Sequence, residues 1–217
     1  MAQSVFITGG TGYMGSRLIP LLAQRGHSVK ALVRPGSEDR LPPGAAKIPG
    51  DALRLDSYTA QIPPCDTFVH LIGVAHPSPA KSRQFREIDL ISIQVAVPAA
   101  VAAGVKHFVY LSIAHPAPMM KEYIAVRSEG EAVLRASGMK ATFLRPWYVL
   151  GPGHRWPCLL VPFYRLCEHL PATREGARRL GLVTLPQMIQ ALLWAVENPP
   201  DEIQILDVPR IRAVRPA

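Results

Sequence analysis

The sequence predicts an α/β fold in which helices cover both faces of a parallel, doubly wound sheet. Short apolar runs of strand length alternate with longer helical patterns over residues 1–152, an order typical of parallel sheets. The first apolar run leads directly into a glycine-rich turn and then a helical segment. A chain of 217 residues is long enough for one such domain, so we predict a single domain over residues 1–217.

The elements follow one another in a regular order. We expect strands at residues 5–8, 28–33, 46–49, 67–72, 107–112, 141–144 and 203–208, and helices at residues 13–24, 84–103, 119–137 and 185–196. Gly26, Gly104 and Gly138 each follow the end of a predicted helix, where glycine commonly stops helices. Pro98 is expected to kink the longest helix, because proline lacks the amide donor of that turn. The basic tail at residues 209–217 is expected to be loose.

The turn after the first strand carries the most informative pattern. Residues 6–15 read Phe-Ile-Thr-Gly-Gly-Thr-Gly-Tyr-Met-Gly, and Gly10-x-Gly12-x-x-Gly15 fits the dinucleotide-binding fingerprint. The glycines would give a tight turn, close approach to a pyrophosphate and close helix–strand packing, with the pyrophosphate at the helix N-terminus. This context predicts a Rossmann-type sheet; the alternative is a glycine-rich turn that binds nothing.

Several segments together resemble one known family. They are residues 8–15, residues 66–72, residues 107–112, the pair Tyr123-x-x-x-Arg127, and Leu144-Arg145-Pro146 followed by Leu150-Gly151-Pro152-Gly153. The chain resembles the extended and atypical short-chain dehydrogenases/reductases over residues 1–153, and within them the NmrA-like NAD(P)H-binding subgroup. The resemblance implies a cofactor-binding core at 1–152, a small substrate lobe at 153–182, and a returning helix and strand at 183–208.

The expected cofactor site combines the fingerprint with positions that the resemblance supplies. Asp51 and Ala52 would meet the adenine, and the backbone at Pro146 would line the nicotinamide. A glycine at position 73 would let backbone pass close to the cofactor. The full expected set is Gly9, Gly10, Thr11, Gly12, Tyr13, Met14, Gly15, Arg34, Asp51, Ala52, Leu71, Ile72, Gly73, Arg127 and Pro146.

Arg34 decides which nicotinamide cofactor is expected. It follows the second strand, 19 positions after Gly15, where an acidic residue would favour NAD and an arginine can meet the 2′-phosphate of NADP. A guanidinium binds phosphate with two donors, so the sequence favours NADP over NAD. Arg17 is placed to assist, whereas Glu38 and Asp39 are placed to reach a ribose instead.

The expected catalytic residues are Tyr123, Arg127 and Ser112. In the resembling family a tyrosine is the general acid/base, and a tyrosine with an ordinary pKa near 10 needs a nearby cation for that role. Tyr123 and Arg127 are one helical turn apart, so they share a helix face. The family has lysine at the second position; arginine keeps the charge but does not relay a proton. Ser112 ends the fifth strand and is expected to hydrogen-bond a substrate carbonyl, or else to cap a loop.

Other residues near these positions allow two interpretations each. His115 is either a loop residue or an additional acid/base, and we favour the loop. Arg145 is expected to pin a loop. The aromatic residues Trp147, Tyr148, Trp156, Phe163 and Tyr164 form either a pocket wall or part of the core.

Charge and composition limit which partners, metals and cellular location we expect. The net charge is +8, but the basic residues are scattered, so we expect a small-molecule substrate and no nucleic acid. Residues 90–105 are too short and too interrupted to span a bilayer, and no signal peptide is visible. Cys65, Cys158 and Cys167 lack metal-ligand spacing, so we expect reduced thiols, a cytoplasmic location and no metal. We expect a monomer or homodimer.

Three functions are therefore left open. The first is an NADP-dependent oxidoreductase acting on a small carbonyl or alcohol. The second is an NAD(P)H-binding regulator or assembly factor without catalysis, as some NmrA-like relatives are. The third is an epimerase or dehydratase that uses bound nicotinamide transiently.

Overall fold

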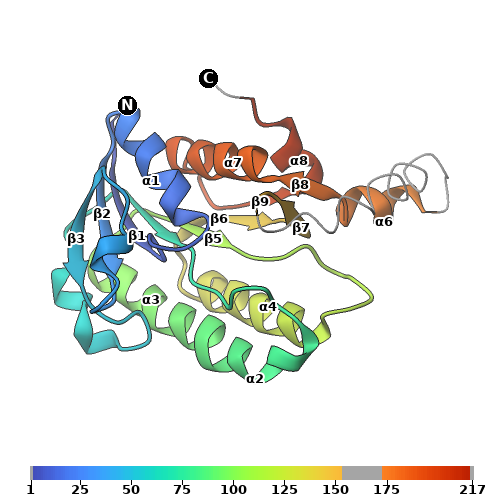
Figure 1. Ribbon diagram of the computed structural model, residues 1–217, viewed down its shortest axis with the longest axis horizontal. Helices are drawn as coiled ribbons and strands as arrows, with labels where there is room; N and C mark the ends of the chain where they lie inside the picture. The colour runs from blue at the N-terminus through green and yellow to red at the C-terminus, as the bar shows by residue number, and fades with distance from the viewer. Residues whose placement is uncertain (1, 153–172, 216–217) are drawn as a thin grey trace.

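The computed structural model describes residues 2–152 and 173–215 and contains one seven-stranded parallel sheet (Figure 1). The strand order is β3-β2-β1-β4-β5-β6-β9, and every neighbouring pair runs parallel. The order reverses direction at β1, as expected for a doubly wound sheet. The strands are β1 (Ser4–Thr8), β2 (Ser28–Val33), β3 (Ala45–Pro49), β4 (Thr67–His70), β5 (His107–Leu111), β6 (Lys140–Arg145) and β9 (Ile203–Asp207). The predicted fold class is confirmed.

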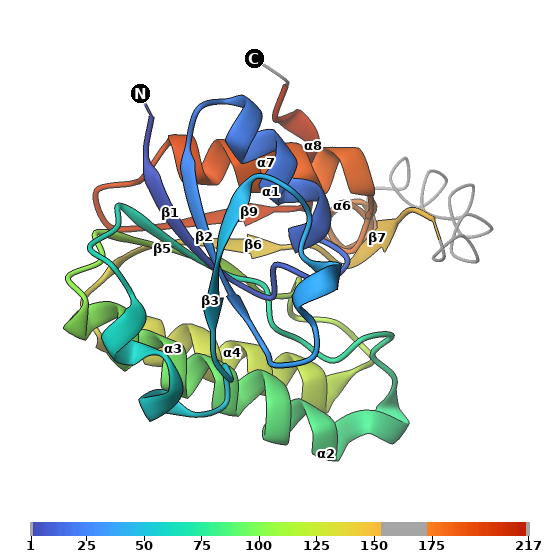
Figure 2. The ribbon, with the colours of Figure 1, turned by 60° about the vertical axis from the view of Figure 1, so that its left-hand side comes forward.

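Helices cover both faces of the sheet, as Figures 1 and 2 show. One face carries α1 (Gly15–Gln24), α7 (Leu185–Glu197) and α8 (Val208–Ala213); the other carries α2 (Ser82–Gln84), α3 (Ile91–Ala102) and α4 (Lys121–Ala136). Short 3₁₀ turns lie in the connections: η1 (Glu38–Arg40), η2 (Leu55–Ser57), η3 (Thr59–Gln61) and η4 (Pro79–Lys81).

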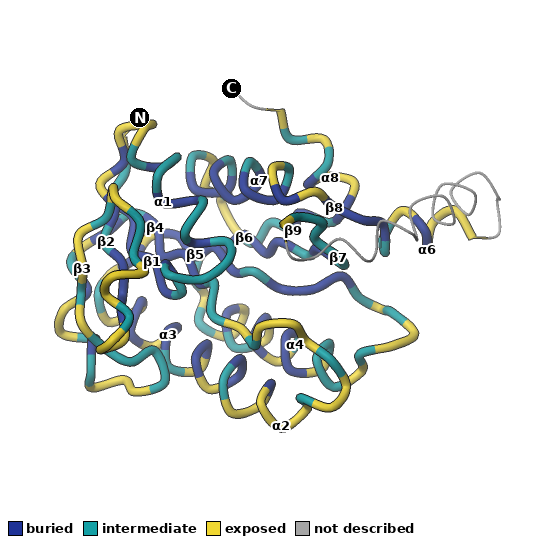
Figure 3. Tube along the Cα trace, viewed as in Figure 1, coloured by how far each residue is buried: buried dark blue, intermediate teal, exposed yellow. Residues whose placement is uncertain are grey.

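The two faces of the sheet have different cores because successive strand residues point to opposite sides. Toward α1 and α7 the sheet presents aliphatic residues, namely Ile7, Val69, Val109 and Leu144. Toward α3 and α4 it presents aromatic residues, namely Phe6, Phe68, Phe108, Tyr110 and Phe143. The rings of Phe68 and Phe108 stack at 4.9 Å between centroids. Figure 3 shows that the buried residues concentrate along the strands between these two helical layers.

The long helix predicted at residues 84–103 is divided in the structure. A π-helical segment, η5 (Phe85–Leu90), separates α2 from α3, and Pro98 lies within α3. Phe85, Asp89 and Leu90 of this segment are buried. π-Helical turns widen a helix locally and recur at functional sites. Asp89, which lies in this segment, is fully buried.

The C-terminal part holds elements that the sequence pattern did not indicate. A second small sheet pairs β7 (Tyr148–Leu150) with β8 (Leu182–Thr184), and α6 (Arg174–Arg179) precedes β8. The prediction of a loose tail is wrong for residues 209–213, which belong to α8. Asp207 accepts a hydrogen bond from the Arg210 amide at 3.1 Å, and Ile211 is buried, so capping and packing stabilise this helix.

Within residues 2–152 and 173–215, no helix combines the length and the apolar character that crossing a bilayer requires.

Candidate functional site

The candidate site lies at the carboxyl edge of the sheet, where ligands bind in folds of this type. The glycine-rich turn follows β1, residues 71–73 follow β4, Ser112 follows β5 and Pro146 follows β6. Parallel strands bring these segments together, and α4 adds Tyr123 and Arg127 from the aromatic side of the sheet.

The glycines of the turn have different surroundings. A Cβ at Gly15 would lie 2.4 Å from the Gly9 carbonyl oxygen, and a Cβ at Gly9 would lie 2.9 Å from the Leu71 carbonyl, so both positions require glycine for packing within the protein. A Cβ at Gly12 would meet only the Gly9 carbonyl oxygen, at 3.1 Å. Gly12 therefore borders open space, as the fingerprint requires at the position where a pyrophosphate approaches.

The residues flanking the turn fall into two groups. Arg34 is exposed directly after β2, consistent with a position at the mouth of a ribose site. Arg17 turns back instead: its Nη1 donates to the Tyr13 carbonyl at 2.7 Å, and its guanidinium lies 4.4 Å from the Tyr13 ring centroid. The Tyr13 hydroxyl in turn donates to the Pro152 carbonyl at 3.2 Å, which ties the glycine-rich turn to the segment after β7.

Arg127 is buried, and its two terminal nitrogens donate to protein groups, whereas its Nε has no hydrogen-bond partner among the described residues. Its Nη2 lies 2.6 Å from Asp89 Oδ1, and the two side chains are 3% and 0% exposed. It also donates to the Leu111 carbonyl at 2.9 Å, the Ile72 carbonyl at 3.2 Å and the Tyr123 hydroxyl at 3.2 Å. Burial raises the pKa of the Asp89 carboxyl, and the Arg127 guanidinium opposes that rise. This geometry ties the ends of β4 and β5 to α4.

Tyr123 lies directly beside this ion pair. Its ring packs on Phe85 at 4.7 Å between centroids, and the Arg127 guanidinium carbon lies 5.2 Å from the ring centroid. The side chain is half-buried, with its hydroxyl held by Arg127. A phenol that accepts a hydrogen bond from a cation keeps its own proton free for another acceptor.

Ser112 belongs to a second buried network. Its hydroxyl donates to Glu131 Oε1 at 2.6 Å, and Glu131 is also bound by both Nε and Nη2 of Arg145. His115 Nε2 lies 3.8 Å from the same carboxylate oxygen. Burial lowers the pKa of His115, and Arg145 adds to that effect, so His115 is neutral near pH 7. Arg145, expected to pin a loop, instead holds the carboxylate that binds Ser112.

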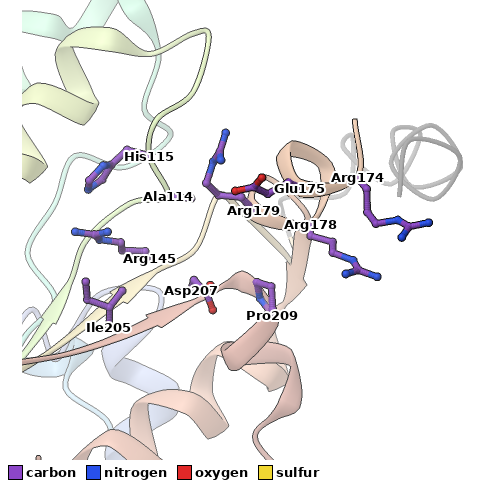
Figure 4. A pocket seen from close by; sticks show the side chains of 10 residues that line it. All are labelled: Ala114, His115, Arg145, Arg174, Glu175, Arg178, Arg179, Ile205, Asp207 and Pro209. Atoms are coloured by element: carbon purple, nitrogen blue, oxygen red, sulfur yellow. The ribbon is translucent and has the colours of Figure 1, made fainter. Parts of the chain in front are cut away.

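A cavity of about 470 Å³ opens beside this second network. Figure 4 shows His115, Arg145 and Ile205 on its inner wall, and the residues of α6 on its outer wall. The residues lining it are Ala114, His115, Arg145, Arg174, Glu175, Arg178, Arg179, Ile205, Asp207 and Pro209.

The other predicted positions are also near this edge. Asp51 accepts from the Leu53 amide at 3.0 Å and so shapes its own turn, and Ala52 packs on the aromatic core. Pro146 accepts from the Ala114 amide at 2.9 Å, and Trp147 packs on the aliphatic core. Gly73 lies against Arg127. The predicted wall residues Trp156, Phe163 and Tyr164, and Cys158 and Cys167, lie outside the described residues.

Sequence reasoning missed Asp89 and Glu131. Each is an acidic residue in the buried part of a helix, and each holds an arginine that the sequence had singled out. The signal that was available is a lone carboxylate in an apolar stretch, as in Ile88-Asp89-Leu90. No group of three or more metal-ligating side chains occurs among residues 2–152 and 173–215.

Comparison with known proteins points to one family. A sequence profile described as NAD(P)H-binding matches residues 9–153. A ceramide reductase from Caulobacter vibrioides is 29% identical over 154 residues, which cover 69% of this chain and 47% of that protein. A photosystem II assembly factor, Ycf39, from Trieres chinensis is 31% identical over 113 residues, which cover 51% of this chain and 34% of that protein. The chain thus spans about half of that reductase's length.

A solved structure extends the likeness over nearly the whole fold. The Bordetella bronchiseptica enzyme WbmH, in complex with NAD+, superposes with a TM-score of 0.71 at 22% identity, covering 95% of this chain and 76% of that one. At this identity the similarity concerns the fold.

Proposed function

We propose that this chain, which belongs to the NAD(P)H-binding family of atypical short-chain dehydrogenases/reductases, is an NADP-dependent oxidoreductase acting on a small carbonyl or alcohol. The observation that carries the proposal is the hydrogen bond from Arg127 Nη2 to the Tyr123 hydroxyl, 3.2 Å long, at the carboxyl edge of the sheet. It gives a tyrosine a fixed position and a cationic neighbour, the two properties that a general acid/base of this kind needs.

The hydrogen-bond directions suggest how the two hydroxyl groups divide their roles. Arg127 donates to Tyr123, so the phenol proton is available for a substrate oxygen. The Ser112 hydroxyl donates its only hydrogen in a hydrogen bond to Glu131, so its oxygen can act only as an acceptor for a further hydrogen bond. In the direction of reduction, Tyr123 would protonate the substrate oxygen, and Ser112 would accept a hydrogen bond from the hydroxyl group so formed. This revises the expectation that Ser112 donates to a carbonyl.

The residues present suit a dinucleotide. Gly12 borders open space, Gly9 and Gly15 pack tightly beneath it, and Arg34 is exposed after β2. The cofactor would supply or accept the hydride, while Gly9–Gly15 would hold its pyrophosphate and Arg34 the 2′-phosphate that distinguishes NADP. Arg34 is the basis for proposing NADP rather than NAD.

A second function has its own observation in favour. Arg127 is 3% exposed and bound to Asp89, so its charge is balanced within the protein, and both of its terminal nitrogens donate to protein groups. An arginine held in this way stabilises the edge of a cofactor site without taking part in proton transfer. That arrangement favours a non-catalytic NAD(P)H-binding regulator or assembly factor in which the cofactor is a bound signal.

Titration of the purified protein with NADPH and NADH, followed by a screen of carbonyl substrates, tests these proposals. We expect Arg34→Ala to weaken NADPH binding by about 1.5–3 kcal/mol, the typical value of a charge-assisted contact, with little effect on NADH. Equal weakening for both cofactors would contradict the assignment of NADP.

The catalytic assignment is tested separately. We expect Tyr123→Phe to abolish turnover while leaving NADPH affinity within about twofold, because the ring and its packing are retained. If no carbonyl compound turns over with the wild-type protein, and Tyr123→Phe binds NADPH as the wild type does, the regulatory function replaces the enzymatic one.

A further inference from the structure

The cavity beside Ser112 has features that the cofactor site does not require. Its inner wall is formed by residues that follow β5 and β6, and its outer wall by α6 (Figure 4). Arg145 lines the cavity and binds Glu131, and Glu131 binds Ser112, so a single carboxylate separates the cavity wall from the Ser112 hydroxyl. The cavity therefore continues the proposed reaction site outward.

The charges on the two walls are not alike. Arg145 is balanced by Glu131, so the inner wall carries no excess charge. The outer wall carries Arg178 and Arg179 together with one carboxylate, Glu175. Asp207, the remaining carboxylate of the lining, accepts from the Arg210 amide at the start of α8. The outer wall is thus the positive side of the cavity.

Arg179 has hydrogen-bond donors that no described residue accepts. Its Nε donates to the Pro116 carbonyl at 3.2 Å, and its two terminal nitrogens have no hydrogen-bond or ion-pair partner within residues 2–152 and 173–215. Figure 4 shows Arg179 between the two walls and Arg178 extending from α6 toward the outside. A guanidinium with two free nitrogens matches the geometry of a carboxylate or phosphate group.

The inner wall offers a further unsatisfied group. His115 Nε2 is buried and has no hydrogen-bond partner among the described residues. Buried polar atoms without partners are uncommon in native proteins, and a ligand oxygen in the cavity would satisfy this one.

We propose that this cavity binds a carboxylate or phosphate group carried by the substrate, with Arg179 as the anion-binding residue, Arg178 as an additional positive charge at the rim and His115 as a further polar contact. The substrate class is then a small acid whose carbonyl or hydroxyl lies near Ser112 and Tyr123 and whose anionic group lies at α6. This proposal rests on the proposed oxidoreductase function only for the reacting end of the molecule.

The first test measures anion binding directly and does not depend on turnover. Inorganic phosphate is titrated into the full-length protein at constant ionic strength, with and without NADPH, and the amide signals of residues 114–115 and 177–181 are followed by NMR. We expect saturable shifts in the wild type and at least tenfold weaker binding in Arg178→Ala/Arg179→Ala. The matched control Arg25→Ala/Arg83→Ala removes the same charge from surface arginines paired with Glu197 and Glu87, and should bind phosphate as the wild type does.

Two results of this titration would overturn the proposal. They are shifts that do not saturate, and equal weakening in both double variants, which would mean that phosphate responds only to net charge. NADPH affinity of Arg178→Ala/Arg179→Ala should stay unchanged, which also verifies that the variant is folded.

The second test identifies the source of the anion. A series of α-keto acids is compared with the corresponding methyl esters in the presence of NADPH. We expect kcat/KM at least tenfold higher for the acid, a preference that Arg178→Ala/Arg179→Ala removes mainly through KM. Esters reduced as well as acids would overturn the substrate class. If nothing is reduced, the oxidoreductase function fails, and the phosphate titration alone decides whether the cavity is an anion site.

Discussion

Two arginine–carboxylate pairs lie at the same edge of the sheet, and they differ in how far water reaches them. Asp89–Arg127 is closed, with side chains 0% and 3% exposed, whereas Glu131–Arg145 is 4% and 17% exposed and borders the cavity. In the first pair the arginine is the centre of the network and contacts Tyr123. In the second the carboxylate is the centre and contacts Ser112. One kind of ion pair therefore orients the two proposed reacting hydroxyl groups in opposite senses, one as donor and one as acceptor.

Breaking the closed pair should have the largest effect on stability. Asp89→Ala leaves the Arg127 charge buried without its counter-ion, and such losses typically cost about 3–5 kcal/mol. Urea unfolding followed by circular dichroism measures the change. The double variant Asp89→Leu/Arg127→Met removes both charges and should recover most of the loss, because neither partner is left uncompensated. A double variant no more stable than Asp89→Ala would show that the pair itself is not the source of the effect.

Breaking the Glu131–Arg145 pair, which borders the cavity, should lower stability less. Glu131→Ala leaves Arg145 next to the cavity, where water solvates the guanidinium, so we expect a loss of about 1–3 kcal/mol in the same urea experiment. Glu129→Ala is the matched control: it lies on the exposed side of α4 and is 3.9 Å from Arg86, so its removal should change stability by less than about 1 kcal/mol. A loss for Glu131→Ala equal to that for Asp89→Ala would remove the distinction between the pairs.

One histidine lies near each ion pair, His70 near Arg127 and His115 near Glu131, so the pH dependence of stability gives a third comparison. The two ring nitrogens of His70 hydrogen-bond to the hydroxyl groups of Thr8 and Ser92. Burial, with Arg127 nearby, lowers the pKa of His70 from 6.5 to about 3. Between those values the unfolded chain binds a proton that the folded protein does not. His70 therefore does not reduce stability above pH 6.5. As the pH drops from 6.5 toward 3, this one group lowers the free energy of unfolding by up to about 1.4 kcal/mol per pH unit.

His70→Gln should flatten that dependence, because the amide keeps hydrogen-bonding groups and does not titrate. Urea unfolding between pH 5 and 8 measures the slope. His107, whose pKa burial lowers to about 4, keeps part of the slope in the variant. The same substitution at half-buried His115 should change the slope less. A larger change at His115 than at His70 would reverse the order of burial inferred for the two networks.

The fold was predictable from the sequence because its signals are local. Strand-length apolar runs, helix-ending glycines and the turn at residues 9–15 lie within short windows, and they gave the parallel sheet and its order of elements. Residues 209–213 were mistaken for part of a loose tail because their helix depends on a cap at Asp207 and on the packing of Ile211 against distant elements. The β7–β8 pair joins segments more than 30 positions apart and has no local signal.

The sequence predicted that the proposed site residues lie at strand ends and on one helix face, but it did not predict their bonding partners. Arg127 was expected to face the cofactor, four residues after Tyr123 on one helix face, and it does contact Tyr123. Its main partner, Asp89, comes from a π-helical turn that no periodicity indicates. Arg127 and Glu131 stand at a spacing that favours pairing along a helix, yet each binds a partner from another element. Tertiary burial decided the partners in both cases.

Gly73 couples its own position in the chain to the side chain of Arg127. A Cβ on Gly73 would come within 2.3 Å of Arg127 Nη2 and 3.2 Å of Asp89 Oδ1, so the glycine makes room for the protein's own guanidinium. A larger residue at 73 would push the guanidinium away from Asp89 and the strand-end carbonyls that it binds. Substitutions at positions 73 and 127 are therefore expected to be non-additive: a side chain at 73 should cost less stability once Arg127 has been shortened.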